Sequence, residues 1–396
     1  MSPALVVMLL SLLLGIQPIT TDLYLPALPA LTEGFGASMA QSQLTLSALL
    51  LAFGLSQLFW GPLSDRFGRR PILLIGLGAY VVAAIGSAFA PSMALLIIWR
   101  IVQGAAMGAA VMCARAIVRD LYTPLSAARA MSRGLTGLGV IACLSAPLGG
   151  LLSDLFSWRV ALLATAVFGT AALAVVALRF KESALHKNPR ALQPGTLVRT
   201  WWTIAKHPTF IAFALLSTAS YGGLFTFLAA SSFVFIRVLG LSKTEYGLVM
   251  FSMSFIYVLG TFWCRRLLPQ FGVRRSVSIA AALTLSGGLL MAVLAWAGLH
   301  NVWALLLPYY LFMFAHGVHQ PCSQSGAVVP FPHAAGAASA LNGFLMMISA
   351  FVMGGWLGSH MDGTVFPLVF GVWFWSALIA LAAWTLVQKH GPTGER

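Results

Sequence analysis

The chain has 396 residues, of which 59% are hydrophobic and only 8% are charged. Soluble domains carry about a quarter charged residues, so this composition excludes a soluble protein. A helix that crosses the bilayer needs about 20 apolar residues, so the chain is long enough for twelve spans joined by short loops. The apolar runs at 4–19 and 44–60 are almost unbroken rather than alternating, which excludes an outer-membrane β-barrel.

Twelve apolar segments predict an all-α membrane protein. In chain order, the expected spans are residues 3–28, 42–62, 71–90, 93–115, 130–152, 159–179, 209–235, 245–264, 276–298, 303–327, 337–357 and 366–388. The longest polar stretch, 181–207, separates the sixth span from the seventh. We therefore expect an N-terminal six-helix bundle at 1–180, a cytoplasmic linker at 181–207 and a C-terminal six-helix bundle at 208–396.

The basic residues indicate the orientation in the membrane. The net charge is +14, and 19 of the 23 lysines and arginines lie on one side of the predicted spans, the side that includes both termini. Loops rich in lysine and arginine stay in the cytoplasm, so we expect both termini there. These bases are scattered over short loops instead of forming one soluble face, which argues against a nucleic-acid partner.

The N-terminal run and the cysteines suggest neither processing nor a metal. No basic leader precedes the first apolar run, so we expect a first span and not a cleaved signal peptide. The cysteines fall in or beside predicted spans and form no C-x-x-C pair; they are Cys113, Cys143, Cys264 and Cys322. We expect them to be small apolar side chains, and we expect no metal site and no cofactor.

A short motif recurs after about half the chain. Phe-Gly-Arg-Arg at 67–70 follows the second span, and Phe-Gly-Val-Arg-Arg at 271–275 follows the eighth. The same motif at equivalent connections predicts a tandem repeat of two similarly oriented halves. Where a repeat of this kind forms a substrate site, the site usually lies between the halves, near the bilayer midplane.

Two charged residues lie at matching depths inside predicted spans. Asp22 is the only acid within an apolar span, and Arg100 lies in the fourth span at a similar distance from the outer surface. An aspartate within a span costs on the order of 3 kcal/mol, which favours a functional role. One interpretation pairs Asp22 with Arg100 in a shared cavity. The alternatives place Asp22 at the outer interface and let Arg100 bind carbonyls at a helix break.

Other polar and aromatic side chains are candidates for lining the cavity. His316 and His319 are three residues apart and share one face of the tenth span. A histidine pair can carry protons, which would make a proton site besides Asp22, but we favour the interpretation that the pair lines a cavity. For Asn342, the alternative is a hydrogen bond between helices. Aromatic walls suit lipophilic drugs, because they offer contact area without one fixed hydrogen-bond pattern. The other candidates are Tyr24, Gln43, Gln103, Tyr221, Phe225, Tyr257 and Gln320.

Several motifs resemble those of a known family. Gly-Pro-Leu-Ser-Asp-Arg-Phe-Gly-Arg-Arg at 61–70 resembles the signature between helices 2 and 3 of the major facilitator superfamily. Arg-Ile-Val-Gln-Gly at 100–104 resembles its R-x-x-Q-G motif on helix 4. The similarity covers nearly the whole chain, and further stretches resemble the Bcr/CflA branch of drug exporters, at 22–29, 43–47, 115–120 and 331–340.

The resemblance implies a proton-coupled antiporter that alternates between inward-open and outward-open forms. In such families an acid on helix 1, here Asp22, is associated with substrate or proton binding. The helix 4 arginine, here Arg100, is associated with proton coupling. The signature after the second span implies a cytoplasmic gating motif that stabilises one conformation, formed by Gly61, Asp65, Arg66, Gly68, Arg69 and Arg70.

The fifth span departs from the family pattern. Antiporters of the superfamily carry G-P-x-x-G-G there, whereas this chain has Ala-Pro-Leu-Gly-Gly at 146–150, with one spacer fewer. We still expect a hinge or seal at Pro147, Gly149 and Gly150, since proline removes a backbone donor and glycine permits close packing. The motif is a weaker sign of antiport than the full pattern.

The sequence therefore predicts a monomeric transporter of the bacterial inner membrane, which exports drug-like or small amphiphilic compounds in exchange for protons. Transport of a small metabolite, proton-coupled or facilitative, is the nearest alternative. An intramembrane enzyme is disfavoured, because only one acid lies in a span and no H-E-x-x-H or G-x-S-x-G string occurs. An ion channel would need a filter or charged rings, which are not evident.

Overall fold

A computed structural model shows an all-helical chain. The structure describes residues 2–122, 124–184 and 193–391. No β-strand occurs within these ranges, and the predicted all-α fold is confirmed.

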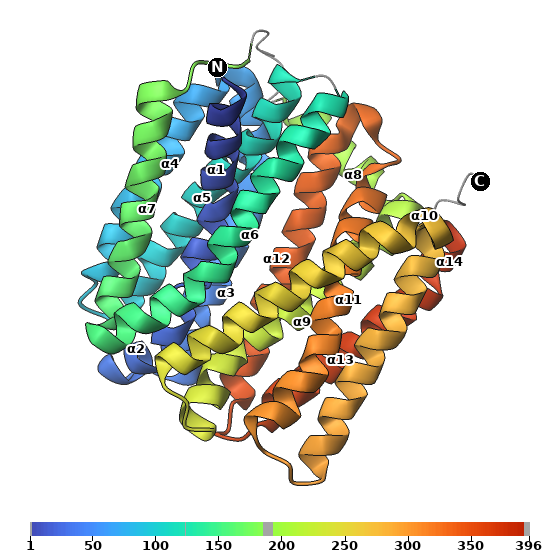
Figure 1. The fold of residues 1–396 in the computed structure, drawn as a ribbon. Coiled ribbons are helices and arrows are strands. Elements are labelled where there is room, and N and C mark those ends of the chain that lie inside the picture. The colour runs from blue at the N-terminus through green and yellow to red at the C-terminus, as the bar shows by residue number, and fades with distance from the viewer. Residues whose placement is uncertain (1, 123, 185–192, 392–396) are drawn as a thin grey trace. The chain divides into compact units, whose positions relative to one another are not determined.

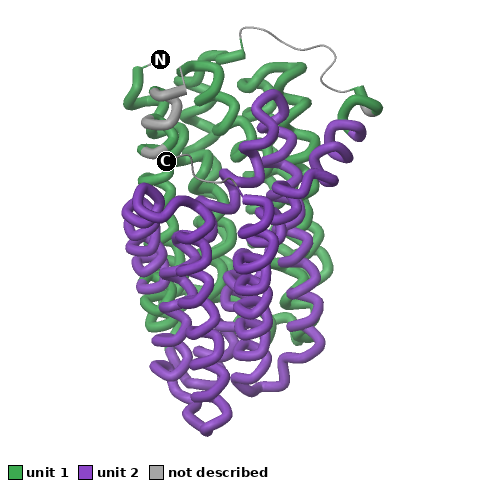
Figure 2. The backbone as a smooth tube through the Cα atoms, turned by 90° about the vertical axis from the view of Figure 1, so that its right-hand side faces the viewer, with its two compact units in different colours: residues 1–197, 242–251 green, residues 198–241, 252–396 purple. Residues whose placement is uncertain are grey.

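The chain divides into two compact units, which Figure 2 shows in different colours. Unit 1 contains residues 1–197 and 242–251, and unit 2 contains residues 198–241 and 252–396. The bundle boundaries expected from the sequence stay predictions.

The described residues of unit 1 form seven whole helices and one short 3₁₀ turn, together with the starts of α8 and α10. They are α1 (Pro3–Thr21), the turn Leu25–Ala27, α2 (Leu28–Gly34), α3 (Met39–Phe67), α4 (Arg69–Ala88), α5 (Met93–Leu121), α6 (Pro124–Leu155) and α7 (Trp158–Arg179). The long helix α5 packs along α3 and α4, and α4 also packs along α7. α1 packs along α6, as Figure 1 shows.

Unit 2 is arranged around α9. Its elements are α8 (Pro194–Ala205), α9 (Pro208–Ser232), a π-helical turn (Phe233–Val238), α10 (Lys243–Trp296), α11 (Val302–Val328), a 3₁₀ turn (Pro332–Ala334), α12 (Ala335–His360), α13 (Phe366–Trp384) and α14 (Leu386–His390). α8 belongs to this unit from Val198 onward, and α10 from Ser252 onward. α9 packs against α11, α12 and α13, so it is the central helix of the unit.

The predicted spans are present. Eleven stretches of the described residues are long and apolar enough to cross a membrane. One of them, α10, contains two predicted spans, 245–264 and 276–298, because its helical backbone is interrupted only at Gly272 (φ 67°, ψ 177°). The loop expected between these two spans is therefore a turn at a single glycine, whose positive φ other residues rarely adopt.

Polar residues start several helices where free N–H groups need partners. At the start of α3, the Ser38 hydroxyl accepts from the Gln41 N–H, and the Gln41 side chain accepts from the Ser38 N–H. This reciprocal pair is a capping box. Ser92 caps α5 and Asn301 caps α11 through their side-chain oxygens. The start of α5, which carries Arg100, is thereby fixed.

The first predicted span is broken near its end. α1 ends at Thr21, and Asp22 is its C-terminal cap. A 3₁₀ turn follows before α2 begins at Leu28. Pro26 has no N–H to donate to the Asp22 carbonyl four residues earlier, which explains the interruption. The first predicted span, 3–28, is present within the apolar stretch Pro3–Gly34, but its helix is interrupted, and Asp22 lies at a helix end.

Two polar connections also differ from the expectation. α3 continues to Phe67, so Asp65 and Arg66 lie in its last turn and not in a loop. Gly68 makes the turn alone, with φ 106° and ψ 162°, and α4 begins at the next residue. Within the expected linker, residues 194–205 form α8, while 185–192 lie outside the described residues.

Candidate functional site

Arg100 lies in the interior of unit 1. Its side chain, on α5, is 0% exposed. Removing a guanidinium from water is costly unless hydrogen bonds and favourable dipoles replace the lost water. The stability of the buried charge therefore depends on the oxygen atoms that accept hydrogen bonds from Arg100.

Every nitrogen of the Arg100 guanidinium has an oxygen partner. Nη2 donates to the Thr20 carbonyl over 3.0 Å, and Nε donates to the Thr45 carbonyl over 3.4 Å. Nη1 donates to Oε1 of Gln103 over 2.8 Å. The guanidinium carbon lies 4.5 Å from the centroid of the Tyr24 ring, a cation–π distance. The Tyr24 hydroxyl in turn forms a hydrogen bond with Oγ1 of Thr45.

Hydroxyl groups extend this network to two more helices. The Tyr80 hydroxyl, on α4, lies 2.6 Å from Oγ1 of Thr20. Nε2 of Gln103 donates to Oγ1 of Thr165, on α7, over 3.3 Å. All of these side chains are fully buried, with 0% exposure. The network therefore joins α1, α3, α4, α5 and α7 through polar groups that water does not reach.

Asp22 lies next to this network, at the end of α1. Its half-buried carboxylate accepts a hydrogen bond from Oγ1 of Thr21 over 2.7 Å. Among the residues that the structure describes, no ion pair joins Asp22 to Arg100. Arg100 instead binds the Thr20 carbonyl at the helix break and the Thr45 carbonyl within α3, and carbonyl binding at a break is the arrangement that the sequence left open beside direct pairing. The roles of Asp22 and Arg100 in proton coupling stay predictions.

The glycines of the fifth span pack against backbone. Gly149 lies so close to the Leu23 carbonyl that an added Cβ would stand 1.8 Å from its oxygen. A Cβ added to Gly150 would stand 2.4 Å from the Lys243 carbonyl oxygen. α6 runs through Pro147 as one continuous helix. The glycines therefore allow close backbone contact next to the α1 break, and bending at Pro147 stays a prediction.

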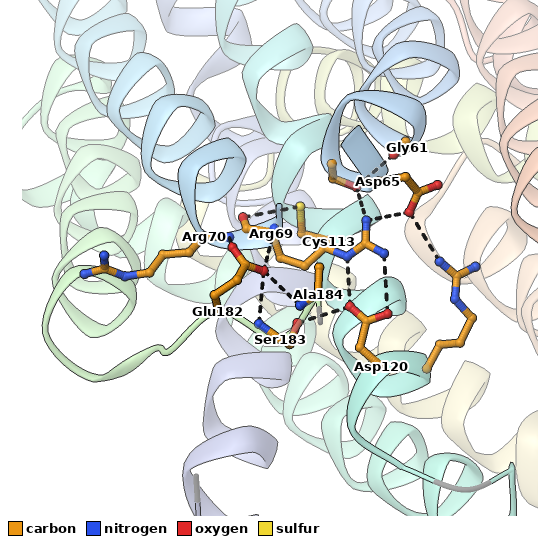
Figure 3. Close-up of polar contacts among 11 residues, drawn as sticks. Gly61, Asp65, Arg69, Arg70, Cys113, Asp120, Glu182, Ser183 and Ala184 are labelled. Atoms are coloured by element: carbon orange, nitrogen blue, oxygen red, sulfur yellow. Dashed lines mark hydrogen bonds and ion pairs between the residues drawn. The ribbon is translucent and has the colours of Figure 1, made fainter. Parts of the chain in front are cut away.

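A second polar cluster lies where α3 ends and α4 begins, and Figure 3 shows Arg69 between two carboxylates. Nη1 of Arg69 is 2.6 Å from Oδ1 of Asp65, and Nε is 2.9 Å from Oδ2 of Asp120. Nη1 also donates to Oγ of Ser64, which donates to the Gly61 carbonyl. The Arg69 side chain is 5% exposed and Asp120 is 15% exposed, so water screens their pairing weakly. The cluster joins α3, α4 and α5.

Glu182, which the sequence analysis did not single out, caps the start of α4 (Figure 3). Its carboxylate accepts from the backbone N–H groups of Arg69 over 2.9 Å and Arg70 over 3.0 Å. It also accepts from those of Ser183 and Ala184, each over 3.0 Å. Burial raises the pKa of Glu182, but the four N–H donors outweigh it, so the pKa lies below its ordinary value. The sequence feature that could have indicated this role is the position of Glu182, a lone acid just after the sixth span in an otherwise basic segment.

The other residues of the signature have separate environments. A Cβ added to Gly68 would stand 2.5 Å from a carboxylate oxygen of Glu182, so glycine leaves room for the cap. Nη2 of Arg70 donates to the Ala177 carbonyl over 3.0 Å. Arg66 is exposed. The gating role of these residues stays a prediction.

In unit 2, the histidine candidates lie in the packed interior. His316 is 3% exposed and His319 is 0% exposed. Oγ of Ser220 lies 2.7 Å from Nδ1 of His316, which links α9 to α11. Oγ1 of Thr284 lies 3.1 Å from Nε2 of His319, which links α10 to α11. Both histidines thus hold helices of unit 2 together, and their cavity-lining role stays a prediction.

Asn342 also joins two helices of unit 2. Oγ of Ser217 donates to Oδ1 of Asn342 over 2.6 Å, which links α9 to α12. This is the hydrogen bond between helices that the sequence offered as an alternative. Of the other candidates, Gln43, Tyr221 and Phe225 are buried, and Tyr257 and Gln320 are half-buried.

Comparison with known proteins identifies the family. The family model described as the Major Facilitator Superfamily matches residues 10–354. The chain belongs to the major facilitator superfamily. The predicted fold class and the predicted family are thereby confirmed, and the chain is a membrane transporter and not an enzyme.

Similar proteins in this superfamily include drug-resistance proteins. Multidrug resistance protein D of Escherichia coli (strain K12) is 31% identical over 346 residues, which cover 87% of this chain and 86% of the relative. The bicyclomycin resistance protein homolog of Haemophilus influenzae is 26% identical over 385 residues, which cover 97% and 96%. These relatives confirm the resemblance to the Bcr/CflA branch.

Solved structures show the same fold. The xylose transporter of E. coli, in a partially occluded inward-open conformation, matches 99% of this chain and 100% of its own, with a TM-score of 0.76 and 15% identity. The human organic anion transporter MFSD10 matches 98% and 100%, with a TM-score of 0.70 and 21% identity. At these identities the likeness concerns the fold alone.

Proposed function

We propose that this transporter exports drug-like or small amphiphilic compounds across the bacterial inner membrane in exchange for protons, by alternating access. The protein acts as a monomer with both termini in the cytoplasm. Inward proton flow drives export, since each charge that crosses 100 mV of membrane potential contributes about 2.3 kcal/mol.

The buried charge of Arg100 beside the α1 break carries this proposal. Arg100 is held by the Thr20 and Thr45 carbonyls, and Asp22 follows Thr20 by two residues. Asp22 caps the same end of α1, so a proton that binds its carboxylate changes the charge at the helix end whose Thr20 carbonyl binds Arg100. We assign the proton coupling that antiport requires to this shared helix end.

The substrate class rests on the relatives and on the aromatic candidates. The relatives are named for resistance to multiple drugs and to bicyclomycin, which supports a drug-like cargo. Tyr221, Phe225 and Tyr257 are the side chains that we assign to contact with an apolar substrate. Aromatic rings tolerate varied ligands, because they offer area without demanding one hydrogen-bond pattern.

Two measurements test the proposal together. The first is drug susceptibility in a host that lacks efflux pumps, and the second is drug-dependent proton flux in inverted membrane vesicles. Asp22→Asn should abolish both while the protein still inserts in the membrane. Asp362→Asn, which changes an exposed acid in the loop before α13, is the matched control and should keep both.

Two outcomes would overturn parts of the proposal. Full proton-driven export by Asp22→Asn would remove the coupling role from Asp22. Movement of the compound only down its own gradient, without proton counterflow, would replace antiport by facilitated transport of a metabolite or drug.

A further inference from the structure

The helix α8, Pro194–Ala205, is amphipathic. It has 12 residues, and its apolar side chains fall on one side of the helix because they follow each other at spacings of three and four. These side chains are Leu197, Val198, Trp201, Trp202, Ile204 and Ala205. The opposite side carries Thr196, Arg199, Thr200 and Thr203.

Only one edge of the apolar side packs against protein. Ile204 is 1% exposed, whereas Val198 is 60% exposed and Trp202 is 62% exposed. The edge formed by Val198 and Trp202 therefore needs an apolar neighbour from outside the described protein.

Positive charge borders the exposed edge. Lys206 follows Trp202 by one helical turn, and its ammonium nitrogen lies 4.3 Å from the centroid of a Trp202 ring. Arg199, next to Val198, is also exposed. The sequence has no acidic residue between Glu182 and Glu245. A negatively charged partner would therefore meet no repulsion from this segment.

The position of α8 limits what its neighbour can be. Only Lys206 and His207 separate α8 from α9, and α9 begins a stretch long and apolar enough to cross a membrane. His207 has an extended backbone (φ −75°, ψ 125°), so the helix axis changes direction there. Only two residues therefore join α8 to a stretch that could cross a membrane.

We propose that α8 lies in the headgroup region of the bilayer and binds anionic phospholipid. Val198 and Trp202 reach the boundary of the acyl chains, and Arg199 and Lys206 bind headgroup phosphates. Helices of this type gain affinity from buried apolar area together with attraction to anionic lipid. Tryptophan favours this depth, because its ring is apolar and its N–H is polar. The assignment depends neither on the transported compound nor on proton coupling.

The depth of the helix is tested with spin labels on its two sides. Val198→Cys and Thr203→Cys are introduced into the full chain after its four cysteines are replaced by alanine, and the protein is placed in nanodiscs of phosphatidylethanolamine and phosphatidylglycerol. The label at position 198 should collide with oxygen and be shielded from a water-soluble nickel reagent. The label at position 203 should show the reverse. Equal exposure of both labels to nickel, or shielding of position 198 from both reagents, would overturn the proposal.

The lipid partner is tested with spin-labelled phosphatidylglycerol and phosphatidylcholine. The variant Arg199→Gln/Lys206→Gln is compared with Arg266→Gln/Lys389→Gln, which changes two exposed bases outside α8. The first variant should weaken phosphatidylglycerol binding at this helix on the order of tenfold, as two bases near an anionic surface imply. Phosphatidylcholine binding and the control variant should not change. Equal loss in both variants, or displacement of the lipid by free inorganic phosphate, would contradict a lipid site on α8.

Discussion

Nη2 of Arg100 donates to the carbonyl oxygen of Thr20 over 3.0 Å, one residue before α1 ends. The last carbonyls of a helix have no donor within the helix, so they need partners from elsewhere. Arg100 supplies such a donor from α5, and in return the carbonyl dipole stabilises a charge that water does not reach. The helix break and the buried arginine therefore depend on each other, and Asp22 lies where the two meet.

Replacing Arg100 tests this dependence. Arg100→Ala removes the donor of the Thr20 carbonyl at the end of α1, and an unsatisfied buried group costs about 1–3 kcal/mol. We expect transport to fall roughly tenfold or more, because a change of about 1.4 kcal/mol corresponds to one factor of ten. Arg100→Lys keeps the charge but cannot supply the planar set of donors, so it should lose nearly as much. Drug-driven proton flux in vesicles measures the effect.

The control for this prediction is Arg266→Ala, which removes an exposed arginine from α10 and should leave transport unchanged. Full transport by Arg100→Lys would show that charge alone suffices and that the carbonyl contacts are dispensable.

The sequence predicted that Asp22 and Arg100 are unusual, because charges inside apolar spans are costly. It left open whether Arg100 pairs with Asp22 or binds backbone carbonyls, and it could not indicate which carbonyls. Two partners of Arg100 are backbone carbonyls, which every residue carries and no sequence pattern marks. The sequence also does not indicate the helix end at Thr21. The apolar residues continue past Thr21, and a hydropathy pattern does not show where the backbone turns within an apolar run.

Close packing at Gly149 gives a prediction with a matched control. A Cβ added at Gly149 would stand 1.8 Å from the Leu23 oxygen, so Gly149→Ala must push α6 away from the α1 break. Overpacking of this kind costs about 1–3 kcal/mol. At Gly139, on the same helix, nothing lies within 4 Å of an added Cβ. Gly139→Ala should be neutral or should stabilise the helix by up to about 1 kcal/mol.

Thermal unfolding in detergent and drug export in cells measure both variants. Gly149→Ala should unfold at lower temperature and lose export, whereas Gly139→Ala should keep both. Equal behaviour of the two variants would show that the α6 contact with Leu23 is not required.

Glu182 and α8 show what composition and motifs alone could not predict. Glu182 acts through backbone N–H groups of a helix that lies more than a hundred positions earlier in the chain. Spacing within the sequence does not indicate such a contact. α8 lies within the stretch that the sequence predicts as a polar linker, because the charges and prolines of that stretch hide the amphipathic order of the apolar residues in α8.

The Glu182 cap predicts a pH dependence of stability. The pKa of Glu182 in the folded protein lies below its ordinary value of 4.5, because four N–H donors favour the carboxylate. A lowered pKa in the folded state means that the stabilisation is fully present above pH 4.5 and is lost as the pH falls through the folded pKa. Glu182→Gln should therefore lower the unfolding temperature at pH 7, and the difference from the native protein should shrink below pH 4.5.

Thermal unfolding across this pH range measures the effect, and Glu33→Gln, which changes an exposed acid on α2, is the control. A constant difference between Glu182→Gln and the native protein at every pH would show that the carboxylate charge does not contribute.

Two cysteines of unit 2 lie closer together than their separation in sequence suggests. Sγ of Cys264 on α10 and Sγ of Cys322 on α11 are 3.9 Å apart, and both side chains are buried. Two glycines bring these helices together. A Cβ added to Gly260 would stand 2.0 Å from the Phe314 oxygen, and a Cβ added to Gly317 would stand 2.6 Å from the Gly260 carbonyl carbon. The backbones therefore touch close to the thiols.

This geometry predicts that a mild oxidant links Cys264 to Cys322 within one chain. The sulfurs need to approach by about 2 Å to reach the disulfide length of roughly 2.05 Å, which side-chain rotation and small helix movements can supply. We expect the loss of two free thiols and a linked peptide pair by mass spectrometry. Cys322→Ser should abolish the link, and Cys113→Ser, which changes a buried cysteine of unit 1, should not. Gly260→Leu should slow the reaction, because the larger side chain separates the two helices. If the native chain kept all four thiols in the presence of the oxidant, this result would contradict the packing of α10 against α11.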